Sequence, residues 1–165
     1  MIEFNIKNRR LRLYPDGVIT CRAIRNGKET KMEIWKVLGT TTTSTGYLKC
    51  KIAIDGVEKT FLRHRIVALA HNPGWDIFDT SMNNMIDHKN NARDDNSGDN
   101  LRVVSHQQNQ FNRSGVKGYS WIKSKNKWRS SIKSDHIQYH LGYYDTEEEA
   151  RAAYLKAKEE LHIIN

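Results

Sequence analysis

The fold and the chemistry of this 165-residue chain depend most on one stretch at residues 85–112, MIDHKNNARDDNSGDNLRVVSHQQNQFN. It begins with a short apolar run, typical of a strand, that ends in the polar pair Asp87-His88. A loop rich in Asn and Asp follows, and the β-prone residues 101–104 predict a second strand. Ser105 is a good helix N-cap, so a short helix should come next. The stretch therefore predicts a unit of strand, loop, strand and helix.

Four polar residues stand at fixed intervals in this unit. After Asp87-His88 come eleven residues and Asn100, then eight residues and Asn109. Each has a structural explanation when taken singly, as a turn hydrogen bond, an Asx-turn or a solvated helix position. Their combination on one strand–loop–strand–helix frame instead favours a catalytic site.

The residue types suit hydrolysis of a phosphodiester, which needs an activated water and a cation that takes up charge on the departing oxygen. His88 is the natural general base, because imidazole titrates nearest to neutral pH. The oxygens of Asp87 and Asn109 are hard ligands suited to Mg²⁺, with Mn²⁺ as a substitute. Asn100 can bond loop backbone groups and hold the loop in shape. No small-molecule cofactor is expected.

Residues 86–89 and 100–105 with Asn109 resemble the HNH nucleases, the ββα-metal or His-Me finger group, and within it the phage homing endonucleases. Residues 63–68, RHRIVA, are similar to the helix start that precedes the motif in those enzymes, and the resemblance covers about residues 10–112. It implies Asp87 and Asn109 as metal ligands, His88 as general base and Asn100 as a structural residue. The usual Asp-Gly after the catalytic histidine is Asn90-Asn91 here, and many members have His in place of Asn109.

Upstream of the motif, residues 1–62 predict a meander of short strands. Strict alternation over 47–54, then Asp55-Gly56, predicts a tight hairpin. The tract 40–45 is low in complexity and is expected to be an exposed loop. Helical spacing over 66–70 stops before Pro73-Gly74. His64 and His71 are candidates for further metal ligands, against a packing or capping role in that helix, which we favour.

The region after the motif concentrates positive charge. Between Arg113 and Lys133 there are seven basic residues and no acidic one, with Tyr119, Trp121 and Trp128 interleaved. Such a pattern on strands suits a sheet laid on DNA, although a sheet with an ordinary basic surface would also show it. Two or three strands are expected over 118–144, followed by a helix that starts at a Thr-x-x-Glu capping box, Thr146 to Glu149.

Residues 115–162 resemble the Apetala-type DNA-binding domain, known from plant ethylene-response factors and from phage endonucleases. The shared features are Leu141-Gly142 with the following Tyr and Thr residues, and Glu149-Ala150 with Ala153-Tyr154. The resemblance implies a three-stranded antiparallel sheet packed on one helix, with strands that enter the major groove. By position it implies DNA contacts from five residues, namely Lys117, Lys123, Trp128, Arg129 and Lys133. Plant members have Arg where this chain has Lys or Ser, for example Ser131, and Lys lacks the bidentate fork of Arg.

Composition agrees with a polyanionic partner. The chain has 27 Lys and Arg against 19 acidic residues, a formal charge of +8, and neutralised phosphates release counterions. The two cysteines, Cys21 and Cys50, form no Cys-x-x-Cys pair, so reduced, partly buried thiols are expected. No signal peptide or membrane-spanning run is visible. We therefore expect a cytoplasmic protein, phage-encoded in a bacterial host, without membrane contact.

These observations predict an α+β chain with two modules: an HNH nuclease domain over 1–112, with its ββα-metal core at 85–112, and a DNA-binding domain over 114–165. The predicted function is a metal-dependent, nicking or homing-type endonuclease acting on double-stranded DNA, and one metal site per chain favours a monomer. Two alternatives are open: a non-catalytic, sequence-specific DNA-binding regulator, and an RNA-directed or nonspecific nuclease.

Overall fold

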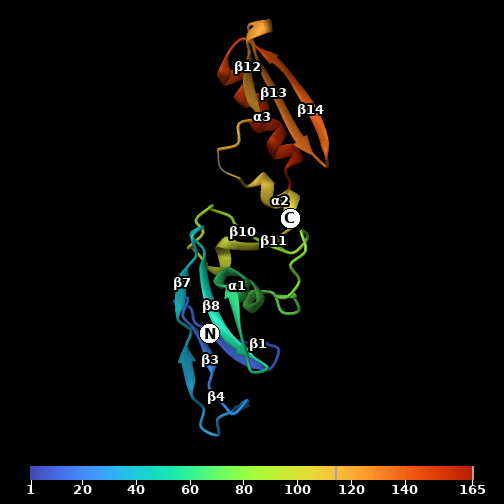
Figure 1. Cartoon of the computed structure of the whole chain (residues 1–165). Coiled ribbons are helices and arrows are strands. Elements are labelled where there is room, and N and C mark those ends of the chain that lie inside the picture. The colour runs from blue at the N-terminus through green and yellow to red at the C-terminus, as the bar shows by residue number, and fades with distance from the viewer. Residues whose placement is uncertain (114, 165) are drawn as a thin grey trace. The chain divides into compact units, whose positions relative to one another are not determined.

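The computed structural model describes residues 1–113 and 115–164, and it divides into two compact units, residues 1–103 and residues from 104 onward. Each unit is described by itself (Figure 1). Ser114, on which the predicted junction between the two modules falls, lies outside the described residues. The predicted module boundaries, 1–112 and 114–165, stay a prediction.

The first unit begins with a series of short strands, as the sequence predicts. Most pair in antiparallel fashion with neighbours in sequence, in sheets ordered β1-β2-β3-β6, β4-β5 and β7-β8-β9. Their bounds are β1 (Ile2–Ile6), β2 (Arg9–Leu13), β3 (Ile19–Arg22), β4 (Ile24–Arg25), β5 (Lys28–Glu29), β6 (Trp35–Val37), β7 (Thr40–Thr42), β8 (Leu48–Ile54) and β9 (Val57–Leu62).

The hairpin of β8 and β9 confirms the alternation seen in the sequence. Cys50, Ile52 and Ile54 are buried along one face of β8. Asp55 and Gly56 both have positive φ, 51° and 78°, which is the backbone that a two-residue hairpin turn of this kind requires. The turn chemistry and the burial pattern therefore fix the same register.

The threonine tract departs from expectation. We predicted an exposed loop over 40–45, but Thr40–Thr42 forms strand β7, which pairs with β8. All three residues are exposed, and β-branched residues favour extended backbone. The tract thus serves as an edge strand, a role for which low hydrophobicity suffices because only its backbone is needed.

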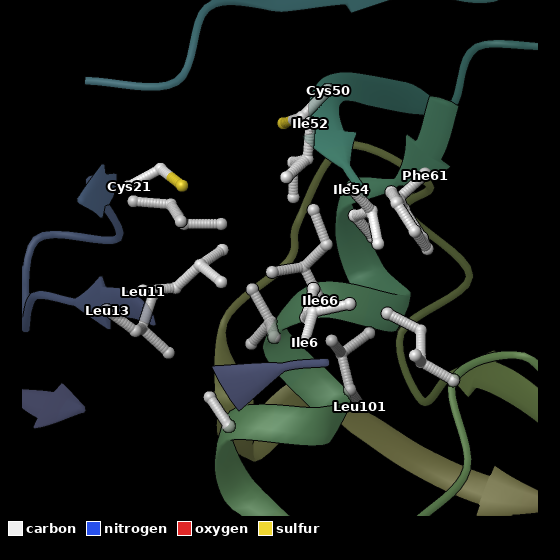
Figure 2. Packing of buried hydrophobic residues seen from close by; sticks show 14 residues of the cluster. Ile6, Leu11, Leu13, Cys21, Cys50, Ile52, Ile54, Phe61, Ile66 and Leu101 are labelled. Carbon is white, nitrogen blue, oxygen red and sulfur yellow. The ribbon is translucent and has the colours of Figure 1, made fainter. Parts of the chain in front are cut away.

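Helix α1 (Arg63–His71) closes the core of the first unit. It ends before Pro73 as predicted, and Ile66, Val67 and Ala70 are buried on its inner face. The helix packs against β1, β8, β9 and β10. Figure 2 shows side chains from several strands gathering around Ile66. The cysteines at 21 and 50 are both buried and free, as expected.

The predicted catalytic stretch forms its elements in the expected order. Strand β10 (Met85–His88) is followed by the loop, the 3₁₀ helix η1 (Gly98–Asn100) and strand β11 (Leu101–Val104), and the two strands pair in one small sheet. Helix α2 (His106–Phe111) follows, with Ser105 as N-cap and Gln108 completing a capping box.

The second unit contains the expected three-stranded antiparallel sheet and its helix (Figure 1). The order is β12 (Tyr119–Ile122), β13 (Lys127–Ser134) and β14 (Ile137–Tyr144), with the 3₁₀ helix η2 (Lys123–Lys125) between the first two. Helix α3 (Glu147–Leu161) packs against all three strands. The capping box of Thr146 and Glu149 is formed. Among the described residues, no helix is long and apolar enough to cross a membrane.

Candidate active site and nucleic-acid interface

Asp87 and His88 occupy the last two positions of β10, and both are buried, at 5% exposure each. Successive residues of a strand point to opposite faces, so the two side chains diverge along the strand itself. They have separate partners accordingly. Asp87 contacts β11, whereas His88 faces the loop that follows β10 and the start of α1.

Asp87 forms an ion pair with Arg102 of β11. Both Nε and Nη2 of Arg102 donate to Oδ2 of Asp87, at 2.9 and 2.7 Å. The Asp87 side chain is 6% exposed and that of Arg102 is 24% exposed. Hydrogen bonds between ionised partners at such distances are the stronger kind, and they hold the carboxylate in one orientation.

Asn100 holds the loop between the two strands, as the sequence predicts. Its Oδ1 accepts from the backbone N–H of Asn90 at 3.0 Å, and its Nδ2 donates to the carbonyl of Asp95 at 2.8 Å. Its own carbonyl accepts from the N–H of Lys89 at 2.9 Å. The buried side-chain amide of Asn100 thus holds the loop that leaves His88 at two points, Asn90 and Asp95.

Replacing Asn100 by alanine is expected to lower the free energy of unfolding by about 1–3 kcal/mol, because it leaves the N–H of Asn90 and the carbonyl of Asp95 without these partners. Urea unfolding followed by circular dichroism measures this. The matched control is Asn83→Ala at an exposed position, expected to change stability by less than about 0.5 kcal/mol. Equal effects of both variants would refute the anchoring role.

Asn96 orients the imidazole of His88. Its Oδ1 lies 3.3 Å from Nε2 of His88, and its Nδ2 donates to the carbonyl of Asp94 at 2.9 Å, which sets the amide so that its oxygen faces the ring. An amide oxygen can only accept, so Nε2 of His88 carries hydrogen in this contact.

His64 lies against His88. The ring centroids are 5.1 Å apart and the planes stand at 89°, and Tyr47 contacts both rings. Burial lowers the pKa of His64 to about 3, with a smaller effect from His88. Among the residues that the structure describes, its buried Nδ1 has no hydrogen-bond partner. His71, the other histidine considered as a ligand, is exposed, and its ring lies against Gly98.

Asn109 lies half-buried in α2, where its N–H donates to the carbonyl of Ser105. Because it belongs to the second unit, its predicted convergence with Asp87 stays a prediction. In the described part of the chain, no three His, Cys, Asp or Glu side chains gather as a metal cluster. A carboxylate and an amide oxygen, completed by water and phosphate, nevertheless fit a Mg²⁺ ion, which is commonly held by one or two carboxylates.

The sheet of the second unit has two different faces. Tyr119, Ser130, Ile132 and Ser134 face α3 and are buried or half-buried. The other side we call the open face. The cross-strand register assigns to it Ser120, Arg129, Ser131, Lys133, Gln138, His140 and Tyr143.

The open face carries cations beside aromatic rings and has no acidic residue among its members. His140 and Tyr143 are in edge contact, 4.8 Å between centroids, and Nζ of Lys125 lies 4.1 Å from the centre of the Tyr143 ring. The shift in register between Ser130 and Ser131 leaves Leu141 without a partner in the register, and the adjacent Gly142 has a φ of 131°, which suits glycine. The bulge keeps Tyr143 and His140 on the same side.

The five predicted DNA contacts are distributed over different surfaces. Arg129 and Lys133 lie on the open face, and Lys123 lies in the exposed η2 turn. Lys117 precedes β12, and its Nζ is 3.6 Å from Glu147. Trp128 lies on the opposite side of the sheet from Arg129, half-buried in edge contact with Trp121.

Sequence reasoning did not find several residues of these sites. In the first unit they are Arg102, Asn96 and the stacking role of His64. On the sheet they are Gln138, His140 and Tyr143, all from β14. Alternation along 137–140 is the signal that would have assigned Gln138 and His140 to one face, whereas Tyr143 joins them only through the register shift in the sheet.

No protein-family model matches the chain, and no curated protein matches it. Among solved structures, the chain is similar to the HNH homing endonuclease I-HmuI, in a structure that describes DNA binding and cleavage by that protein. The sequence identity is 22%, the match covers 99% of this chain and 85% of that chain, and the TM-score is 0.48. At this level of similarity, function has to be inferred from the chain's own residues.

Proposed function

We propose that the chain is a metal-dependent DNA endonuclease of the HNH type, with His88 as general base. The main support is the arrangement at the end of β10: a buried histidine oriented by Asn96, beside a buried aspartate, on a loop fastened by Asn100. Proton abstraction from water requires a histidine that is held in place through one ring nitrogen and accepts the proton at the other. In His88, Asn96 holds the ring at Nε2.

In the proposed reaction, Nδ1 of His88 accepts a proton from a water that attacks the scissile phosphorus in line. Asn96 keeps the ring in the tautomer that leaves Nδ1 basic. Asp87 and Asn109 would hold Mg²⁺, or Mn²⁺ in its place, whose charge when bound stabilises the transition state and the departing 3′ oxygen. Arg102 must share or release the carboxylate of Asp87 when the cation binds, because it occupies one oxygen in the present arrangement.

Double-stranded DNA is the proposed substrate, and the open face of the sheet is proposed to bind it. Arg129 and Lys133 supply charge to phosphates, and Gln138 and the neighbouring rings can reach base edges. The resemblance to the Apetala-type domain also assigns Lys117, Lys123 and Trp128 to DNA. Because Trp128 lies on the other side of the sheet, its contact would have to come from the sheet edge.

We expect the double variant Arg129→Ala/Lys133→Ala to weaken DNA binding roughly 10- to 100-fold at moderate salt. The slope of log K against log salt should flatten by about 2, since two phosphate contacts are lost. Fluorescence anisotropy across a salt series measures both. Lys156→Ala, at an exposed position of α3, is the matched control for charge and should leave the slope nearly unchanged. If the double variant keeps the wild-type slope of log K against log salt, DNA does not bind at the open face.

With one proposed cation site per chain, we expect a monomer that nicks one strand, as a nicking or homing-type endonuclease. The alternative function, a non-catalytic DNA-binding regulator, predicts binding without turnover under any divalent ion. Incubating supercoiled plasmid with Mg²⁺ separates these two, because only a nuclease yields the open circle. On a phage genome, discrete bands indicate a site-specific enzyme and a smear indicates a nonspecific one.

A further inference from the structure

We propose that His64 is a positioning residue for His88, an inference that rests on the proposed nuclease function. The imidazole of His64, in the first turn of α1, contacts that of His88 edge to face, and the two ring centroids are 5.1 Å apart. Neither the metal-ligand role considered for His64 nor a capping role accounts for this stack.

Tyr47 completes an aromatic wall around the proposed base. Its ring centroid lies 5.2 Å from that of His64 and 5.9 Å from that of His88, and the guanidinium of Arg93 lies 5.2 Å from the Tyr47 ring centre. With Asn96 at Nε2, the ring of His88 is held by a hydrogen bond and by two aromatic neighbours. Rotation of His88 about its side-chain bonds is thereby restricted, and an acceptor nitrogen must be placed closely for proton transfer to be efficient.

The chemical character of His64 suits this role. Its pKa, lowered to about 3 mainly by burial, keeps His64 neutral near neutral pH. A second cation beside His88 would oppose the positive charge that His88 acquires from the water's proton. A neutral aromatic ring at this distance does not oppose it.

Folding alone does not call for histidine at position 64. Nδ1 of His64 is buried with no hydrogen-bond partner in the described part of the chain, which is unfavourable, and an apolar side chain of similar size would avoid that loss. Stability and catalysis should therefore respond differently to substitution here, and this separates a positioning role from a structural one.

Two apolar substitutions test the inference. His64→Phe keeps an aromatic ring in contact with His88, whereas His64→Leu keeps the volume without a ring. We expect His64→Leu to lower kcat for nicking about 10- to 100-fold with KM for DNA within about twofold, and His64→Phe to recover most of the loss. Both should melt at or above the wild-type temperature. In NMR spectra of the free protein, the His88 ring resonances should shift in His64→Leu and stay in place in His71→Ala, the control on the same helix.

The outcomes separate this inference from the function on which it rests. Wild-type kcat in His64→Leu, or equal losses in both variants, would overturn the positioning role while leaving the nuclease intact. A loss of kcat that follows a fall in melting temperature would assign His64 to folding instead, and would also overturn it. If the wild-type protein makes no nicks, or if His88→Ala still makes them, the proposed function itself fails, and the inference fails with it.

Discussion

His88→Ala should leave no measurable strand cleavage while DNA binding stays close to wild type. General-base catalysis contributes about 10²- to 10⁴-fold, and alanine offers no group that could take the water's proton. The side chain is buried between Asn96 and two aromatic rings, so no neighbouring histidine can move into its place without repacking. The measurement is conversion of supercoiled plasmid to open circle with Mg²⁺, beside a gel shift on the same DNA.

Two controls accompany this variant. His71→Ala removes an exposed imidazole from the same unit and should cut at the wild-type rate. A melting curve of His88→Ala shows whether the loss of a buried ring has unfolded the protein, since truncating a buried residue costs stability. Cleavage by His88→Ala at the wild-type rate, in folded protein, would remove His88 from the mechanism.

Much of the fold could be predicted because it depends on local rules. The hairpin at Asp55-Gly56, the helix end before Pro73 and the two capping boxes each involve residues a few positions apart. Strand β7 could not be predicted in this way. The threonine tract is β-prone but shows no hydrophobic alternation, and its strand becomes evident only from its pairing with β8.

In the candidate site, too, contacts between residues close in sequence could be predicted and contacts between distant residues could not. The role of Asn100 could be predicted because its partners, Asn90 and Asp95, lie in the adjoining loop. The partners that sequence reasoning missed are far away in the chain or depend on the pairing of strands. Arg102 reaches Asp87 only across the paired strands β10 and β11, and His64 reaches His88 only because α1 packs beside β10.

Trp128 gives a different lesson. It was grouped with Arg129 as a DNA contact, yet neighbours in a strand point to opposite faces, so both could not lie on one face of a sheet. Strand alternation contained this information without any structure. The resemblance to a known domain outweighed it, because a shared motif assigns positions to DNA without saying which side of the sheet presents them.

The second large effect is expected at Asp87. Asp87→Ala should abolish binding of the divalent cation, because it removes the carboxylate of the proposed ligand pair and Mg²⁺ is seldom held without one. Binding can be measured without turnover, by titrating Mn²⁺ and following the free ion by electron paramagnetic resonance. The substitution also leaves Arg102 without its partner, at a cost of about 1–3 kcal/mol, less than for a fully buried pair because Arg102 is 24% exposed.

Arg102→Gln makes the test of Asp87 specific. Arg102 and the cation are alternative positive partners for one carboxylate, so replacing Arg102 by a neutral side chain should strengthen Mn²⁺ binding several-fold while Asp87→Ala abolishes it. Both variants break the same ion pair, so a loss of binding caused merely by disturbing β10 and β11 would appear in both. Opposite changes support Asp87 as the ligand. If Asp87→Ala binds Mn²⁺ as the wild type does, the cation lies elsewhere and the proposed chemistry loses its metal.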